Sequence, residues 1–140
     1  MNPGERVQAE AAVLATNQEF YEAFSRGDYQ AMSALWAKRV PVLCLHPGAA
    51  LLSGRDAVLQ SWRQLLDAAP AWRMVSRDAT VHVLGQSAFV TCLEANGDQP
   101  AHLIATNIFV WEEERWRLVH HHAGPLTVPQ RPRARADLVN

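Results

Sequence analysis

The chain has 140 residues, of which 49% are hydrophobic and 19% charged, a composition typical of one globular domain. Its formal net charge of −1 argues against nucleic-acid binding by phosphate neutralisation. No segment reaches the ~20 apolar residues that span a bilayer, so no membrane partner is expected. The first residues, MNPGERVQ, contain an early acid and no apolar run, which argues against a secretory signal. A cytoplasmic protein is the expectation.

Helical periodicity dominates the first half of the chain. In chain order it predicts helices over 6–26 and 29–37, a small hairpin of strands over 40–46 and 50–52, and a third helix capped by Ser53. Gly27 suits the left-handed residue that ends the first helix, and Asp28 can cap the second.

From residue 72 onward the pattern alternates, which is typical of strands. It predicts four antiparallel strands, over 72–84, over 87–95, from 101 to a turn at 112–114, and from that turn onward. Asn96-Gly97 is a strong hairpin signal. The sequence therefore predicts an α+β fold, with three helices packed on a curved antiparallel sheet that encloses a pocket. We expect one domain over 1–126 and a flexible tail over 127–140, which is rich in Pro and Arg.

Three consecutive histidines, His120 to His122, end the last predicted strand. Imidazole changes charge near neutral pH more easily than any other side chain. Because side chains alternate on a strand, Trp116, His120 and His122 should share one face with apolar Leu118. We therefore expect these three residues to line the pocket and His121 to point away from it.

A metal site is a weaker interpretation of the same residues. His120 and His122 have the spacing of a His-x-His pair, and His46 or Glu94 could supply a third ligand. However, a metal needs three or four converging ligands, and the two cysteines lie inside the apolar runs VLCL and VTCL. We therefore predict no metal and no cofactor.

Other candidate residues leave alternatives open. Asn107 interrupts an apolar strand, so its buried amide would either donate to a ligand or pair with a neighbouring histidine. Glu94 either points inward with a raised pKa or lies in solvent near the turn at 96–97. Trp36 suits a core, whereas Trp62 could face a ligand.

The chain resembles the nuclear transport factor 2-like superfamily, in particular its bacterial SnoaL-like and ketosteroid-isomerase-like members. The resemblance covers about residues 9–125 and is carried by FYEAFSRGDYQAMSALWA, VLCLHPG, LLSGRDAVLQSWRQLL and ATNIFVWEEERWRLVHHHAGP. It implies a cone-shaped α+β fold and a homodimer formed through the outer face of the sheet. It says little about function, because this fold hosts many activities.

The isomerase-like members also suggest individual roles. By their register, His46 occupies the position of the general base, and Asn107 that of a protonated acid that donates to an oxyanion. The position of a second donor, a tyrosine, falls on Phe20, while Tyr21 is expected to point elsewhere. Steroid isomerisation by the same mechanism is therefore not expected, but a pocket with a base and a donor is.

These observations lead to one main functional hypothesis and two alternatives. The main one is a small-molecule-binding, SnoaL-like protein, acting as a cofactor-free isomerase, cyclase or dehydratase by proton transfer on an apolar carbonyl-bearing substrate. Its expected catalytic residues are His46, Asn107, His120 and His122, and its expected pocket residues are Phe20, Trp36, Trp62, Glu94 and Trp116. The alternatives are a non-catalytic ligand-binding or dimerisation module and, less favoured, a divalent-metal enzyme.

Overall fold

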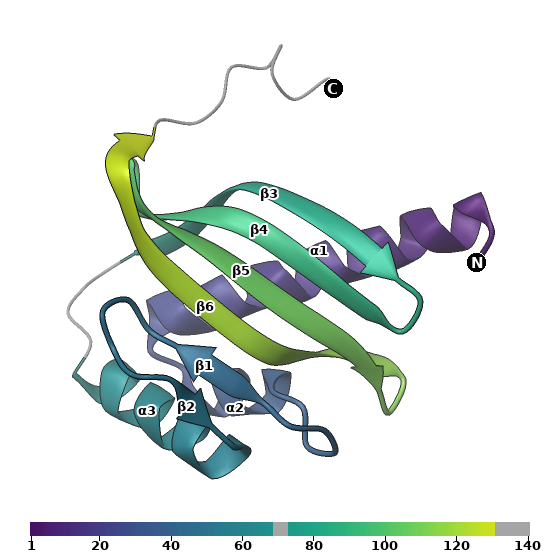
Figure 1. The fold of residues 1–140 in the computed structure, drawn as a ribbon, viewed down its shortest axis with the longest axis horizontal. Helices are drawn as coiled ribbons and strands as arrows, with labels where there is room; N and C mark the ends of the chain where they lie inside the picture. The colour runs from purple at the N-terminus through teal and green to yellow at the C-terminus, as the bar shows by residue number, and fades with distance from the viewer. Residues whose placement is uncertain (69–72, 131–140) are drawn as a thin grey trace.

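A computed structural model describes residues 1–68 and 73–130 of the chain (Figure 1). The helices are α1 (Pro3–Arg26), α2 (Tyr29–Leu35) and α3 (Arg55–Asp67), and the strands are β1 (Leu43–Leu45), β2 (Leu52–Ser53), β3 (Met74–Leu84), β4 (Ser87–Asn96), β5 (Ala101–Glu112) and β6 (Arg115–Gln130). None of the helices in these two ranges is long and apolar enough to cross a membrane.

All the strands belong to one curved sheet in the order β2-β1-β6-β5-β4-β3. Strands β3 to β6 form the predicted antiparallel meander, β1 joins the edge of β6 in parallel, and β2 pairs with β1. Helix α1 crosses the concave side of the meander, while α2 and α3 lie beside β1 and β2 (Figure 1). The predicted α+β class is confirmed.

The ends of the helices follow local capping chemistry. Helix α1 begins at Pro3, earlier than predicted, because Asn2 and Glu5 form a reciprocal capping box. The predicted left-handed end at Gly27 (φ 66°) and the Asp28 cap are both present. The predicted Ser53 cap is wrong: Gly54 precedes α3 with no side-chain cap, and Ser53 belongs to β2.

Strand β6 extends farther than the sequence indicated. It continues to Gln130, which pairs with Ala101, so residues 127–130 belong to the sheet rather than to a tail. The rest of the predicted tail, residues 131–140, lies outside the described residues, as does Trp72, where β3 was expected to begin.

The alternation of β6 is interrupted by one extra residue. Phe109 pairs with Leu118, but the next pair along is Ile108 with His120, so Val119 has no partner on β5. This is a β-bulge, which reverses the side to which each later side chain points. Leu118 is therefore buried, and so are His121 and Ala123 beyond the bulge.

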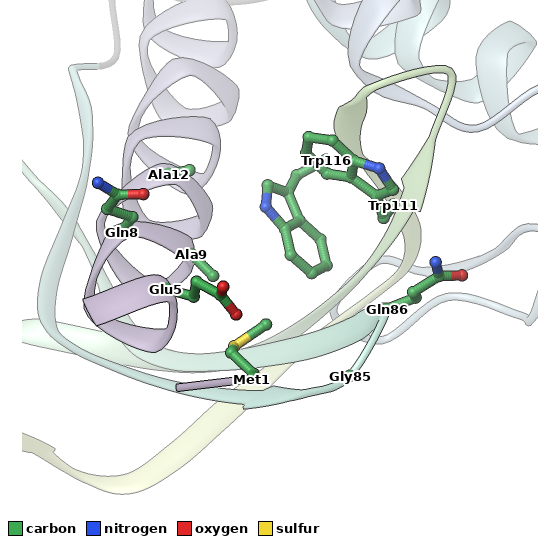
Figure 2. A pocket seen from close by; sticks show the side chains of 9 residues that line it. All are labelled: Met1, Glu5, Gln8, Ala9, Ala12, Gly85, Gln86, Trp111 and Trp116. Atoms are coloured by element: carbon green, nitrogen blue, oxygen red, sulfur yellow. The ribbon is translucent and has the colours of Figure 1, made fainter. Parts of the chain in front are cut away.

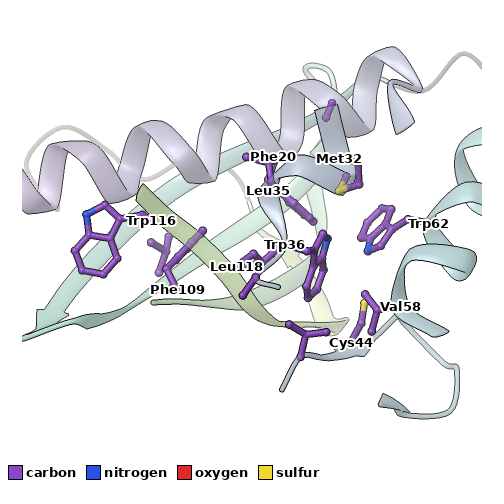
Figure 3. Packing of buried hydrophobic residues seen from close by; sticks show 14 of the residues in the cluster. Phe20, Met32, Leu35, Trp36, Cys44, Val58, Trp62, Phe109, Trp116 and Leu118 are labelled. Atoms are coloured by element: carbon purple, nitrogen blue, oxygen red, sulfur yellow. The ribbon is translucent and has the colours of Figure 1, made fainter. Parts of the chain in front are cut away.

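The hydrophobic core lies between the helices and the concave face of the sheet (Figure 3). Trp62 of α3 is fully buried and packs edge-to-face on Phe20 and Phe24 of α1, with ring centroids 5.2 and 5.1 Å apart. Trp36 is also fully buried. Phe20, Trp36 and Trp62, expected in the pocket wall, are thus core residues that join the three helices to the sheet.

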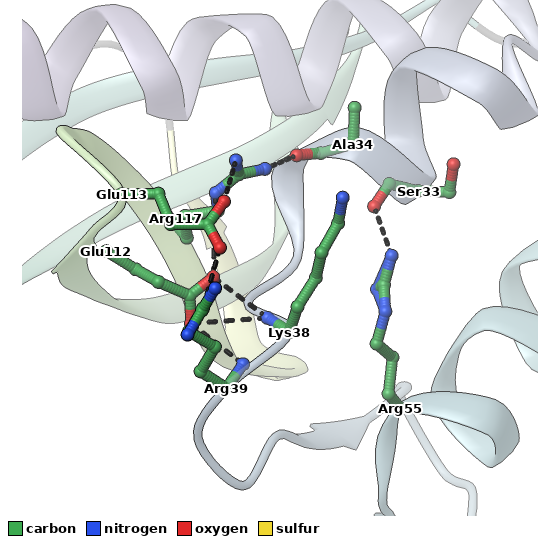
Figure 4. A network of polar contacts seen from close by, with 8 residues as sticks. All are labelled: Ser33, Ala34, Lys38, Arg39, Arg55, Glu112, Glu113 and Arg117. Atoms are coloured by element: carbon green, nitrogen blue, oxygen red, sulfur yellow. Dashed lines mark hydrogen bonds and ion pairs between the residues drawn. The ribbon is translucent and has the colours of Figure 1, made fainter.

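A polar network fixes the segment after α2 against the turn between β5 and β6 (Figure 4). The Glu112 carboxylate accepts the backbone N–H groups of Lys38 and Arg39 at 3.0 and 2.9 Å. Buried Arg117 donates to the Ala34 carbonyl at 2.6 Å, and its Nε lies 3.7 Å from Glu112 Oε1. These contacts hold the segment that leads into β1 beside β6.

We expect Trp62→Ala to lower the free energy of unfolding by about 3–5 kcal/mol, the usual cost of removing a buried aromatic side chain. Leu65→Ala, at a 38% exposed position of the same helix, is the matched control and should cost less than about 1 kcal/mol. Urea unfolding followed by circular dichroism measures both. Equal losses in the two variants would contradict this packing.

Candidate functional site

A connected group of polar side chains lies inside the concave face of the sheet. Tyr21 of α1 donates a hydrogen bond from Oη to Glu94 Oε2 of β4 at 2.7 Å, and Cys92 Sγ lies 3.2 Å from the same hydroxyl. Asn107 of β5 donates from Nδ2 to Asn17 Oδ1 at 2.8 Å and to Tyr21 Oη at 3.2 Å. All of these side chains are buried.

His121 completes this network from β6. Its Nδ1 lies 2.6 Å from Asn107 Oδ1, and its Nε2 lies 3.9 Å from Glu94 Oε2. Because Asn107 already donates from Nδ2, its Oδ1 can only accept, so the proton of His121 is on Nδ1. The unprotonated Nε2 of His121 therefore faces the Glu94 carboxyl group.

Burial shifts the pKa values of both Glu94 and His121. Loss of water raises the pKa of Glu94 from 4.5 to about 7, although the Tyr21 hydrogen bond acts in the opposite direction. Burial lowers the pKa of His121 to about 3, with smaller effects from the nearby histidines. At neutral pH His121 is uncharged, and Glu94 is close to its titration midpoint.

His46 lies next to this network but is not hydrogen-bonded to it. Its ring centroid is 4.9 Å from that of Trp62 and 6.3 Å from that of His121. Ser61 Oγ donates to the Val58 carbonyl, so it accepts from His46 Nε2 at 3.0 Å. Burial lowers the pKa of His46, which favours the neutral imidazole.

Glu94 also borders a pocket of about 430 Å³, where β4 turns into β5. Its apolar lining includes Met74 and Leu103, and its polar lining includes Asn96, Gln99 and His102. A carboxyl group that titrates near neutral pH at the wall of a pocket can exchange protons with a bound molecule. The pocket and the buried network therefore meet at Glu94.

The expectation that His120 and His122 face the interior is wrong. The bulge at Val119 turns both side chains to the outer face of the sheet, and His122 is exposed. His121, expected outside, is the buried one. Asn107 is buried and pairs with a histidine, one of the two possibilities left open, and Glu94 points inward.

The proposed metal ligands are not brought together. His46 and Glu94 lie on the inner side of the sheet, whereas His120 and His122 lie on the outer side. Within residues 1–68 and 73–130, no group of three or more His, Cys, Asp or Glu side chains could hold a metal ion. Trp116, the remaining expected pocket residue, lines a different pocket at the far end of the sheet.

Sequence reasoning missed Tyr21, His121 and Asn17. Tyr21 was placed away from the site because Phe20 occupied the tyrosine register, but both side chains are buried. Phe20 faces Trp62 of α3, and Tyr21 faces β4. The inner stripe of α1 is wide enough for both, because this helix contacts α3 as well as the sheet.

Comparison with known proteins identifies the family. Residues 13–127 match the family model described as a SnoaL-like domain. The structure of a "putative dehydratase" of the NTF2-like family from Streptomyces avermitilis is 34% identical, with a TM-score of 0.78, over 86% of this chain and 98% of that one. The chain therefore belongs to the SnoaL-like family, and its fold is the NTF2-like cone.

Two further relatives carry different names. A "putative calcium/calmodulin-dependent protein kinase type II association domain" from Thiobacillus denitrificans is 35% identical, with a TM-score of 0.72, over 81% of this chain and 94% of that one. The F-box protein SKIP8 of Arabidopsis thaliana is 27% identical over 84% of this chain. The chain spans about half of that plant protein, 51% of its length.

The raised pKa of Glu94 predicts a pH-dependent stability difference between the wild type and Glu94→Gln. The folded state binds the Glu94 proton more tightly than the unfolded state does, so this contribution is complete below pH 4.5 and is lost as the pH rises to about 7. Relative to the wild type, Glu94→Gln should gain about 3 kcal/mol between pH 4.5 and 8. Urea unfolding at several pH values measures the difference.

The lowered pKa of His121 gives stability the opposite dependence on pH. Because the wild type and Glu94→Gln both contain His121, this effect cancels when the two proteins are compared. Glu19→Gln, at an exposed position of α1, controls for the loss of one acidic group and should show no comparable gain. A Glu94→Gln difference that is independent of pH would show that Glu94 titrates as an ordinary surface acid.

Proposed function

We propose that this protein binds a small, apolar, carbonyl-bearing molecule and catalyses proton transfer on it without a cofactor. One observation supports this above the others: Glu94 is buried, has a pKa of about 7, and borders a pocket of about 430 Å³. Such a carboxyl group can both remove and return a proton at neutral pH. The likeness to a "putative dehydratase" is consistent with this chemistry.

In the proposed reaction, the Glu94 carboxylate removes a proton from the carbon next to the carbonyl group. The electron pair of the broken C–H bond forms a carbon–carbon double bond, and the π pair of the C=O bond moves onto the oxygen, which gives an enolate. If the substrate has a β,γ double bond, the enolate is conjugated, and protonated Glu94 returns the proton to the γ-carbon as the C=O bond re-forms, which is isomerisation. If the substrate has a β-hydroxyl group, protonated Glu94 gives the proton to that oxygen, the Cβ–O bond breaks, water leaves, and the enolate electrons form the Cα=Cβ bond, which is dehydration. Asn96, Gln99 and His102 at the pocket carry N–H donors for the enolate oxygen.

The buried network would hold Glu94 in position rather than contact the substrate. The Tyr21 hydroxyl and the Asn107 amide already use their donors within the network. Asn107 would therefore act through Tyr21 and His121, and not as the direct donor expected from the sequence. His46 remains the competing candidate for the base, and its half-buried imidazole is neutral at working pH.

We expect the wild-type protein to catalyse hydrogen–deuterium exchange at carbon atoms next to a carbonyl group. The assay incubates the protein in D₂O with a panel of cyclic and aromatic ketones, each with a C–H bond beside its carbonyl group. Proton NMR follows the loss of the signal of that C–H group. Glu94→Gln should slow the exchange by about 10²- to 10⁴-fold, the usual contribution of a general base.

Two variants sharpen the assay. His122→Gln changes a histidine on the outer face and should exchange at the wild-type rate. His46→Ala tests the competing base: loss of exchange in this variant, with Glu94→Gln unaffected, would transfer the role to His46. Absence of exchange above the buffer rate for every ketone in the panel would contradict the catalytic proposal.

A second candidate function is an association module, supported by the 35% identical protein named as an association domain. The outer face of the meander carries apolar side chains. Ile104 of β5 is 45% exposed, and Ile108 pairs there with Phe89 and His120. Under this proposal the protein forms a homodimer through the outer face of its sheet.

Ile104→Asp should then weaken the dimer by at least about tenfold, because each copy would bury a carboxylate without a partner. Light scattering after size-exclusion chromatography measures the molar mass over a range of concentrations. Val7→Asp, at an exposed position of α1, is the matched control and should leave the mass unchanged. A monomeric wild-type protein would reject the dimer.

A further inference from the structure

A second pocket lies at the opposite end of the interface between α1 and the sheet (Figure 2). It has a volume of about 420 Å³ and is bordered by the first turns of α1, the turn between β3 and β4, the end of β5 and the start of β6. Glu94 lies at the other end of the same interface. This pocket is therefore separate from the proposed catalytic site.

Two tryptophans form the wall of this pocket on the sheet side. Trp111 and Trp116 pair across β5 and β6, with ring centroids 5.5 Å apart at 67°. Ala9 and Ala12 of α1 lie opposite (Figure 2), and their small side chains leave space beside the indoles. Trp111 is 43% exposed, and a large aromatic side chain exposed within a concavity is typical of a ligand site.

The carboxylate of Glu5 lies beside this apolar space (Figure 2). Glu5 Oε2 accepts the Asn2 N–H at 3.2 Å, and Oε1 has no partner among the described residues. Gln8 and Gln86 also line the pocket, and their side-chain amides point away from the tryptophans (Figure 2). The lining residue Met1 carries the amino terminus, and Glu5 is the one anionic group among the described residues that line the pocket.

We propose that this pocket binds a small organic ammonium ion that carries an apolar group. The ammonium would contact Glu5 Oε1 and the face of an indole ring, since a cation is attracted to both. The apolar group would occupy the space between Trp111, Trp116 and Ala9. This site does not depend on the proposed catalysis at Glu94.

Three probes of similar size and different charge test the proposal: 2-phenylethylamine, 2-phenylethanol and phenylacetate. Binding is followed by the indole N–H signals of the full-length protein in ¹H–¹⁵N NMR spectra. The amine should shift the Trp111 and Trp116 signals, leave the Trp62 signal unchanged, and bind at least about tenfold more tightly than the alcohol, as a hydrogen bond to a charged group predicts.

Glu5→Gln should weaken binding of the amine about tenfold and leave the alcohol unchanged. Glutamine can still complete the capping box with Asn2, so α1 should keep its start. Trp111→Leu provides a second test at a partly exposed position and should weaken both probes. Glu94→Gln should bind the amine as the wild type does.

Three results would each overturn the proposal. They are equal affinity for amine and alcohol, tighter binding of phenylacetate than of the amine, and absence of any shift in the Trp111 and Trp116 signals. In Glu5→Gln, an unchanged affinity for the amine would also reject Glu5 as the recognition element.

Discussion

The extra residue in β6 determines which polar groups this protein buries. With regular pairing, His120 and His122 would share a face with Leu118, and His121 would be in solvent. The bulge at Val119 instead keeps both Leu118 and His121 on the concave face. The first of these two side chains completes the hydrophobic core, and the second enters the polar network. Thus one unpaired residue of β6 places both an apolar and a polar side chain on the same face.

A buried histidine and a buried acid are costly unless their hydrogen bonds are satisfied. Here a series of hydrogen bonds satisfies these groups: His121 donates to Asn107, Asn107 donates to Tyr21, and Tyr21 donates to Glu94. In this series of hydrogen bonds each group donates toward the Glu94 carboxyl group, and Asn107 also donates to Asn17. This direction stabilises the carboxylate form, while burial opposes it, and the balance leaves the pKa of Glu94 at about 7. Without the Tyr21 hydrogen bond that pKa would be higher still.

Elements set by local chemistry were predictable from the sequence. The candidate site was not, because it depends on a bulge and on helix packing that leave no local pattern in the sequence. The meander, the turn at Asn96 and Gly97, and the helix end at Gly27 follow from alternation and from residues that adopt positive φ. A bulge adds one residue without changing composition, so alternation placed the histidines on the wrong faces. Tyr21 was misplaced because a helix packed on two partners buries a wider stripe than one apolar face suggests.

Helix α1 contributes residues to both the network beside Glu94 and the pocket beside Trp111 and Trp116. Its middle and last turns supply Asn17 and Tyr21 to the buried network, and Ser25 donates to the Met74 carbonyl near the Glu94 pocket. Its first turn places Glu5 beside the two tryptophans. The core between these regions is filled, since Val13 and Phe20 are buried there. This close-packed core resists movement of α1 along the sheet, so the structure keeps the two regions at fixed positions on one helix.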